Sequence, residues 1–378
     1  MSKALVLAGG GAKGSYQVGV WRALQELDWR PDIITGTSVG CLNGVMFALD
    51  AYETARDMWT RIGDENVLKL PASGDLSHLS AFVQDIIAGG GLDVSPLEQM
   101  VELVLDEDAL RAAPIRFGLV TVEQRGLRAR ELTLDEIPKG MVKDYLMASA
   151  ACFPAIRPRV IEGKKFIDGG YSDNMPFGLA QRMGATELCC VNVDGVGLTR
   201  PNHTGLPTVT VESWWDLGEL FRFVPSVAKR NIELGYNDTY RAFGKMRGTA
   251  YAVRPEGADA ALFPLRAKFD AEAQTLAAAI PALELAEKAA ETLFRAQDAP
   301  LCWLESAAHT AGVDPTHIYT VEQLSAAFLK AYPLEQYRRF AALFGPNGPD
   351  APTAARAGVQ PAEYLAAVAF HALAEGKA

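Results

Sequence analysis

Residues 3–14 read KALVLAGGGAKG and residues 32–40 read DIITGTSVG, and these two stretches decide the fold. Each joins a short apolar run to a glycine-rich turn, and a helical pattern follows each turn. Residues 16–27 carry apolar side chains at spacings of four, four and three, and residues 41–49 open a second apolar helix. Two consecutive strand–turn–helix units of this kind are typical of a mostly parallel sheet covered by helices.

The rest of the chain extends this pattern. Residues 187–194 predict another core strand, and residues 115–122 and 127–134 flank Gly126 as an antiparallel pair near a sheet edge. The sequence thus predicts an α/β fold with a central, mostly parallel sheet and a helical C-terminal extension. Helices are expected in residues 76–105, with a break at residues 89–91, and in the alanine-rich ranges 271–295, 321–331, 334–343 and 361–373.

Composition limits the class of protein. The 378 residues include 36 Lys and Arg against 46 Asp and Glu, for a formal net charge of -10, with 49% hydrophobic and 22% charged residues. Such a chain can bury a core, which excludes intrinsic disorder as a description of the whole. The negative charge argues against nucleic acid as a partner and against electrostatic adsorption to anionic lipid.

Targeting signals and cysteines indicate a compartment. No run of about eighteen uninterrupted apolar residues occurs, and the apolar run before the first glycines is too short for a signal peptide. The cysteines at positions 41, 152, 189, 190 and 302 have no metal-type spacing. We expect reduced thiols, no bound metal and a cytosolic protein that meets membranes at most at their surface.

The first motif is the glycine loop, GGGAKG at residues 9–14. Glycines leave successive backbone N–H groups uncovered before a helix, where negative charge is favoured. The letters also fit the dinucleotide pattern, but that pattern expects an acidic residue at the end of the next strand, and Asp32 stands at its beginning. A phosphate loop would need Gly-Lys-Ser, and the order here is Lys13-Gly14-Ser15. A cofactor-free oxyanion loop is the better interpretation.

The second and third motifs carry a nucleophile and a base. Ser38 lies in GTSVG, between a strand and a helix, and a serine on so sharp a turn needs small residues two positions away on each side, as Gly36 and Gly40 are. The third motif is DGG at residues 168–170. An aspartate of ordinary pKa, about 3.9, is a weak base for a serine hydroxyl, and it requires strong oxyanion stabilisation nearby.

In this order the motifs resemble those of the patatin-like phospholipases, over about residues 3–200, with the linking segment ASAACFP at residues 148–154 and with Asn174 and Pro176 after the DGG. The resemblance implies a three-layer patatin-like fold, a serine–aspartate dyad without histidine, and hydrolysis of fatty acyl esters with no cofactor or metal. The roles that it implies are Ser38 as nucleophile, Asp168 as base, Gly9, Gly10 and Gly11 as the oxyanion hole, and Lys13, Gly14, Gly36, Gly40, Gly169 and Gly170 as motif support.

Two alternatives stay open. Ser38, then Asp168 or Asp194, then His203 follow the order of an α/β-hydrolase triad. A non-catalytic protein that binds a nucleotide or phosphate on the glycine loop is the other.

The expected domains are a patatin-like catalytic core at residues 1–205, remaining core segments with an interfacial or lid region at 206–265, and the helical extension at 266–378. The partners implied are a lipid or acyl-ester substrate and peripheral membrane contact, and the oligomeric state is open. The aromatic stretch at residues 213–229, which includes Trp214 and Trp215, fits an interfacial face or a buried core helix, and we favour the core helix.

Overall fold

The computed structural model describes residues 2–68, 91–263, 265–266, 298–342 and 361–375. The chain divides into two compact units, residues 1–242 and residues 243–378. The helices expected in residues 76–90 and 271–295 lie outside the described residues. Among the described helices, none is long and apolar enough to cross a membrane.

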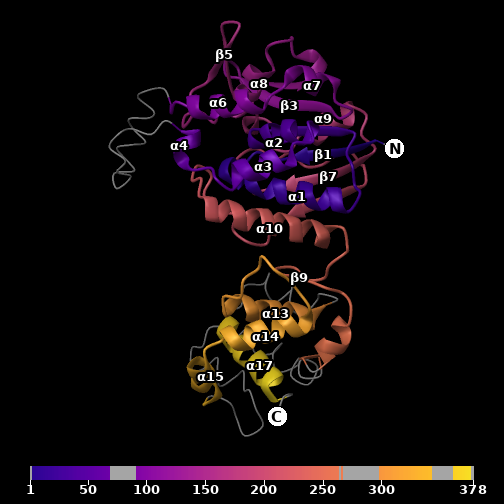
Figure 1. The fold of residues 1–378 in the computed structure, drawn as a ribbon, viewed down its shortest axis with the longest axis vertical. Coiled ribbons are helices and arrows are strands. Elements are labelled where there is room, and N and C mark those ends of the chain that lie inside the picture. Colours follow the sequence, from indigo (N-terminus) through magenta and orange to yellow (C-terminus); the bar gives the residue numbers. More distant parts are fainter. Residues whose placement is uncertain (1, 69–90, 264, 267–297, 343–360, 376–378) are drawn as a thin grey trace. The chain divides into compact units, whose positions relative to one another are not determined.

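A mixed sheet forms the centre of the first unit and, in its described part, has eight strands (Figure 1). Its parallel strands lie side by side in the order β3 (Arg116–Glu123), β2 (Ile33–Thr37), β1 (Lys3–Leu7), β7 (Glu187–Asn192) and β8 (Thr208–Glu212). At one edge, β4 (Arg128–Thr133) and β6 (Lys164–Asp168) pair antiparallel with β3, and β5 (Arg159–Ile161) pairs antiparallel with β6. The predicted mostly parallel sheet is confirmed.

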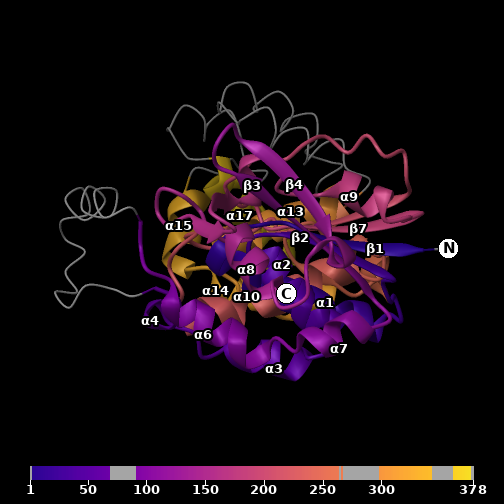
Figure 2. The same ribbon diagram turned by 90° about the horizontal axis from the view of Figure 1, so that it is seen from above.

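Helices cover both faces of this sheet (Figure 2). α1 (Ser15–Glu26) and α2 (Val39–Ala48) lie on one face, and α9 (Phe177–Arg182) packs on β1 and β2 from the other. α10 (Pro225–Ala242) packs against α1, and α8 (Val142–Ser149) against β3. The remaining helices of the unit are α3 (Tyr52–Trp59), α4 (Asp64–Val67), α6 (Ser95–Val104) and α7 (Glu107–Ala112). This is the three-layer α/β arrangement that the sequence predicts.

The burial of β1 explains why its sequence is continuously apolar. Ala4, Leu5, Val6 and Leu7 have no exposed surface, because β2 and β7 flank the strand and helices cover both faces. β4, at the sheet edge, is polar and largely exposed. The pattern of hydrophobicity in each strand therefore follows its place in the sheet.

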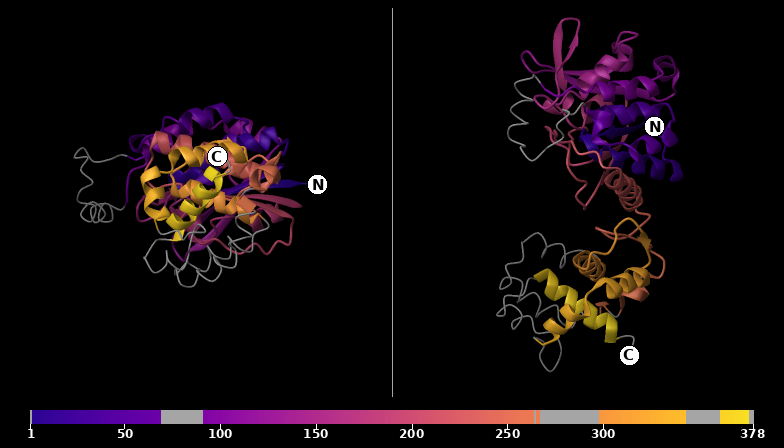
Figure 3. Two further views of the ribbon diagram at one scale, coloured as in Figure 1. Left: turned by 90° about the horizontal axis from the view of Figure 1, so that it is seen from below. Right: turned by 60° about the vertical axis from the view of Figure 1, so that its left-hand side comes forward.

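The second unit is helical, as predicted (Figures 1 and 3). α13 (Ala299–Thr310) packs on α14 (Val321–Ala331) and α17 (Pro361–Glu375), and α17 also contacts α15 (Leu334–Ala341). A short parallel pair joins β9 (Ala252–Val253) to β10 (Ile318–Tyr319). Buried Glu305 on α13 accepts the backbone N–H groups of residues 249–251 at 2.8–2.9 Å, which ties the chain before β9 to the helices.

The aromatic stretch at residues 213–229 does not form the buried core helix that we favoured. α10 begins only at Pro225, and the Trp214 side chain is 49% exposed. Side-chain hydrogen bonds replace helical ones, because Ser213 Oγ accepts Trp215 N–H at 3.0 Å and Asp216 Oδ1 accepts Gly218 N–H at 2.8 Å. β8 and α10 belong to the first unit and residues 243–265 to the second. A lid role for residues 206–265 stays a prediction.

Candidate active site

Ser38 lies on the sharp turn between β2 and α2. Its backbone has φ 54° and ψ -128°, a conformation that non-glycine residues rarely adopt. A Cβ on Gly36 would lie 2.5 Å from the carbonyl carbon of Gly40, and a Cβ on Gly40 would meet the Leu7 carbonyl oxygen. The turn therefore requires glycine at both positions, for the steric reason expected of a nucleophile turn.

A buried hydroxyl holds this strained turn in place. Ser149, at the end of α8, accepts the Ser38 N–H at 2.9 Å and donates its own proton to the Val120 carbonyl at 2.6 Å. The Cys41 thiol donates to the Ser38 carbonyl at 2.9 Å. These bonds hold the backbone of Ser38 in its strained conformation.

The pairing of β6 with β3 brings Asp168 to Ser38. Thr37 pairs with Val120, and Asp168 pairs with the next residue of β3, Thr121. The Gly170 N–H donates to Oδ1 of Asp168 at 2.7 Å, and the Ser38 side chain lies close enough to the carboxylate to act to lower its pKa. Two residues 130 positions apart thus meet at one edge of the sheet.

Burial makes Asp168 a stronger base than a free aspartate. Its side chain is 6% exposed, and desolvation raises its pKa to about 6, although the hydrogen bonds from Gly170 and Ser38 act in the opposite direction. A carboxylate with a pKa nearer neutrality is better matched to proton transfer at pH 7.

The glycine loop lies against both residues. A Cβ on Gly9 would lie 3.0 Å from the Ser38 Cβ, and Gly9 itself exchanges hydrogen bonds with Asn174, through its N–H at 3.3 Å and its carbonyl at 3.2 Å. Gly11 has φ +52°. Among the described residues, no acceptor bonds the N–H of Gly10 or of Gly11. These two amides, rather than that of Gly9, are free to bind an anionic oxygen.

Ser38, Asp168 and the three loop glycines Gly9, Gly10 and Gly11 line one cavity. Its walls are almost wholly apolar, and many of the lining side chains come from α2, α3, α6 and the segment at residues 220–223. Representative lining residues are Met46, Trp59, Ile62, Met100, Val104 and Phe223. Such a cavity fits an unbranched apolar chain attached to a group that reacts at the mouth.

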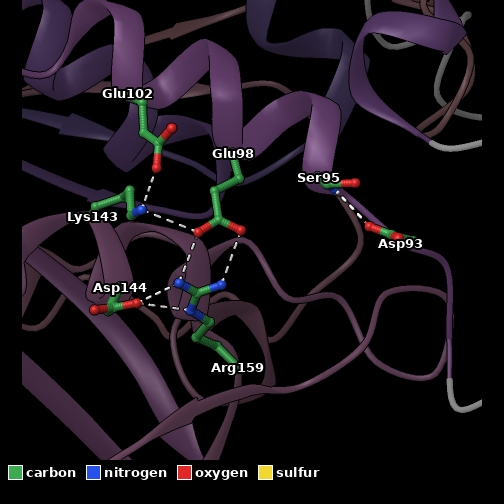
Figure 4. Close-up of polar contacts among 7 residues, drawn as sticks. All are labelled: Asp93, Ser95, Glu98, Glu102, Lys143, Asp144 and Arg159. Atoms are coloured by element: carbon green, nitrogen blue, oxygen red, sulfur yellow. Dashed lines mark hydrogen bonds and ion pairs between the residues drawn. The ribbon is translucent and has the colours of Figure 1, made fainter.

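An ionic cluster fastens the α6 wall of this cavity to the core (Figure 4). Arg159 on β5 forms a two-pronged bond to Glu98 on α6, at 2.9 and 3.1 Å, and also bonds Asp144 on α8. Lys143 on α8 bonds Glu98 and Glu102. These contacts, led by the Arg159 hydrogen bond, lower the pKa of Glu98, so the cluster stays ionised at neutral pH. The bidentate geometry sets the position of α6 over the cavity.

Other predicted residues lie elsewhere. Lys13 donates from Nζ to the Asp194 carbonyl at 2.8 Å and does not line the cavity. His203 is exposed, and of the four histidines in the described residues none lines the cavity, nor does Asp194. Asp32 accepts the Lys3 N–H at 2.8 Å, at the end of the strands opposite the glycine loop. Gly14 packs against Val39, since a Cβ would lie 2.5 Å from its Cγ2.

Three buried polar residues beside the site were not singled out from the sequence. They are Ser149, Gln17 on α1 and Asn43 on α2, each at most 2% exposed. The pattern that could have identified them is a polar residue within an otherwise apolar helical face. A polar side chain at such a buried position needs hydrogen-bond partners. Within the described residues, no group of three His, Cys, Asp or Glu side chains is arranged to hold a metal ion.

Comparison with known proteins agrees with this geometry. Residues 5–180 match the family model described as patatin-like phospholipase. Lysophospholipase NTE1 of Mycosarcoma maydis is 30% identical over 219 residues, which are 57% of this chain and 11% of that protein. Patatin-like phospholipase domain-containing protein 6 of Homo sapiens is 26% identical over 271 residues, which are 67% of this chain and 18% of that protein. The chain spans less than a fifth of the length of these relatives.

Solved structures give weaker likenesses. VipD from Legionella pneumophila aligns over 98% of this chain and 91% of its own, with 14% sequence identity and a TM-score of 0.38. The type III effector protein ExoU aligns over 96% and 87%, with 15% identity and a TM-score of 0.37. Neither adds to what the family match shows. Residues 5–180 therefore form a patatin-like phospholipase domain by their match to the family model.

Proposed function

We propose that this chain is a serine hydrolase of fatty acyl esters that works with a Ser38–Asp168 dyad. The observation that carries the proposal is that Ser38 and buried Asp168 line one apolar cavity together with Gly10 and Gly11, whose amides are available. Nucleophile, base, oxyanion donors and a site for the acyl chain then meet within one cavity.

In the first half of the reaction, Ser38 Oγ attacks the ester carbonyl carbon while its proton passes to Asp168. The carbonyl oxygen becomes an oxyanion, which accepts hydrogen bonds from the N–H groups of Gly10 and Gly11. Collapse of the tetrahedral intermediate breaks the bond to the alcohol, and Asp168 returns the proton to the leaving oxygen. The acyl chain remains on Ser38.

The second half repeats these steps with water. Asp168 takes a proton from water as the water oxygen attacks the acyl-enzyme, the same two amides bind the new oxyanion, and Ser38 leaves with the returned proton. Fatty acid is released and the dyad is restored. The raised pKa of Asp168 supports both halves, because a carboxylate must accept and return a proton at neutral pH.

The cavity points to a lipid as the substrate. Its apolar walls suit an acyl chain, with the polar head group left outside them. Relatives are named lysophospholipase and patatin-like phospholipase, which agrees with an ester of a lipid. A cytoplasmic location stays a prediction.

The proposal is tested by hydrolysis of p-nitrophenyl acyl esters by the parent and two variants. Ser38→Ala should remove activity by at least about 10³-fold, because burial raises the pKa of the other nucleophile that lines the cavity, the Cys152 thiol, to about 12 and keeps it protonated. His203→Ala should stay within twofold of the parent, since His203 is exposed and away from the cavity lining. A loss in His203→Ala as deep as in Ser38→Ala would replace the dyad with a triad.

The nucleotide-binding alternative has less support. The acidic residue that would bind a ribose, Asp32, is bonded to the Lys3 N–H at the far end of the sheet. The space beside the glycine loop is lined by Leu220, Phe221 and Phe223, which offer no polar partner for a phosphate.

The activity should depend on pH through Asp168. Below its pKa of about 6 the carboxyl is protonated and cannot accept the Ser38 proton, so kcat/KM should fall about tenfold per pH unit as pH drops further. The measurement is kcat/KM for a soluble ester from pH 5 to 8. Asp173 is the matched control, because burial also raises its pKa to about 6, and Asp173→Asn should retain the acidic limb. If the acidic limb of the profile disappeared in Asp173→Asn, Asp173 and not Asp168 would be the group that titrates.

A rim of exposed apolar side chains supports contact with a lipid surface. Val196, 78% exposed, lines the cavity, and Leu198, 55% exposed, donates its N–H to the Gly170 carbonyl at 2.7 Å. Leu198→Ser should lower binding to phosphatidylcholine vesicles about tenfold in a sedimentation assay, because an inserted leucine contributes roughly 1.5 kcal/mol. Leu334→Ser, an exposed leucine of the second unit, is the control. Equal sedimentation of Leu198→Ser and the parent would remove this rim as the contact.

A further inference from the structure

Two buried amide side chains connect the glycine loop to the helices beneath it. Gln17 on α1 has no exposed surface and Asn43 on α2 is 2% exposed. The reaction steps above use neither. Because a buried amide without partners costs free energy, the question is which groups these two side chains satisfy.

Their hydrogen bonds end on the two carbonyls that flank the glycine loop. Gln17 Nε2 donates to the Ala8 carbonyl at 2.7 Å, and Asn43 Nδ2 donates to the Gly14 carbonyl at 2.9 Å. Asn43 Nδ2 also donates to Gln17 Oε1 at 2.8 Å, so the two amides brace one another. A carbonyl can only accept, and this fixes the orientation of both amides.

The third member of the network lies in the cavity wall. Trp59 Nε1 donates to Asn43 Oδ1 at 3.0 Å, and the Trp59 ring lines the cavity and stacks on Phe223 with centroids 6.2 Å apart. The network therefore runs without a break from the acyl cavity to both ends of the glycine loop.

Inside these two anchor points most polar groups of the loop are already bonded. Gly9 is bonded to Asn174 on both sides, the Lys13 N–H donates to the Gly10 carbonyl at 3.1 Å, and the Ala12 N–H donates to the Leu220 carbonyl at 2.8 Å. With the ends held and the middle bonded, the N–H groups of Gly10 and Gly11 have little freedom to turn away from the cavity. Oxyanion donors stabilise a transition state best when they need no reorganisation.

We propose that Gln17 and Asn43 are positioning residues, which hold the Gly10 and Gly11 amides in the geometry that binds the oxyanion; this rests on the proposed function. Gln17 does not line the cavity, and the Asn43 amide, which does, is engaged by Gln17, Gly14 and Trp59. Their contribution is made in the transition state, so their loss lowers kcat and leaves KM nearly unchanged.

The test uses Gln17→Met, which keeps the length of the side chain and removes both hydrogen bonds. We expect a fall in kcat of about tenfold or more, with KM within twofold, on a p-nitrophenyl acyl ester. Active sites are titrated with a fluorophosphonate, so that kcat refers to folded enzyme only. Asn231→Leu is the matched control, since Asn231 is a fully buried amide that donates to the Leu217 carbonyl at 2.8 Å. Its kcat per active site should stay within twofold of the parent.

A second readout separates positioning from general damage. Ser38 Oγ adds to the carbonyl of an alkyl trifluoromethyl ketone, its proton passes to Asp168, and the new oxyanion occupies the place of the reaction intermediate. Gln17→Met should weaken this inhibitor by the same factor as kcat. The affinity for the matching methyl ketone, which binds without adding, should change less than twofold.

The outcomes distinguish this inference from the proposed function. A parent enzyme that neither hydrolyses the ester nor reacts with the fluorophosphonate overturns the proposed function itself. An active parent with an unchanged kcat in Gln17→Met, or with both ketones weakened equally, overturns the positioning role alone. If Gln17→Met does not fold, Gln17→Glu is tested by the same criteria. Glutamate keeps the shape of the side chain and still accepts the Asn43 hydrogen bond, but it replaces the donor to the Ala8 carbonyl with a carboxylate oxygen.

Discussion

Replacement of Asp168 by Asn should lower kcat for acyl esters by about 10³- to 10⁴-fold. The amide has nearly the shape of the carboxylate and still accepts the Gly170 N–H, but it cannot take the Ser38 proton. The loss falls on both halves of the reaction, because the same group activates serine and then water. Substrate binding depends on the apolar cavity, so KM should change little. The measurement is steady-state hydrolysis of a p-nitrophenyl acyl ester.

Stability provides the control for this variant. Burial raises the Asp168 pKa to about 6, well above the ordinary value of an aspartate, so the folded protein binds the proton more tightly than the unfolded chain does. The fold therefore loses stability as pH rises from about 4 to 6, by roughly 3 kcal/mol in all. Asn carries no charge, and the Tm of Asp168→Asn at pH 7 should equal or exceed that of the parent. A variant with normal Tm and kcat within tenfold of the parent would exclude Asp168 as the base.

Substitution of Gly11 by Ala should lower kcat by about 10²- to 10³-fold. Gly11 has φ +52°, which disfavours any side chain, and an added Cβ would meet the Leu220 carbonyl oxygen. The loop must shift to relieve this contact, and the Gly10 and Gly11 amides move with it. Because the acyl chain binds deeper in the cavity, KM should stay within about threefold. Steady-state kinetics on the same ester measure both constants.

Gly140→Ala is the matched control for backbone strain. Gly140 also has a positive φ, +88°, but an added Cβ would find no atom within 4 Å. The backbone strain in Gly140→Ala should lower the stability about as much as the strain in Gly11→Ala does. The kcat of Gly140→Ala should equal that of the parent. If Gly11→Ala retained the kcat of the parent while its Tm fell like that of Gly140→Ala, the glycine loop would have a structural role only.

The sequence was informative where the constraint is local. The strands of the sheet follow from short apolar runs, and the turn at Ser38 follows from Gly36, which is crowded by the backbone of Gly40 and Cys41 a few residues later. The bounds of α14 agree with the expected range of residues 321–331. In each case the residues that determine the structure are neighbours along the chain.

Long-range features could not be read in this way. Asp168 reaches Ser38 through the antiparallel register of β6 on β3, which no local pattern encodes; only the family resemblance paired the two residues. The raised pKa of Asp168 comes from burial, which depends on the complete fold. The stretch around Trp214 looked apolar enough for a core helix, but its serine and aspartate side chains bond the backbone instead.

The most direct test of the account is intact-protein mass spectrometry after treatment with a fluorophosphonate. The reagent loses fluoride as Ser38 Oγ bonds to phosphorus, and this occurs at a useful rate only when the serine is activated. The account predicts one adduct on the parent, none on Ser38→Ala, and labelling of Asp168→Asn slowed by at least about a hundredfold. An unlabelled parent, or a Ser38→Ala protein labelled as fast as the parent, would contradict it.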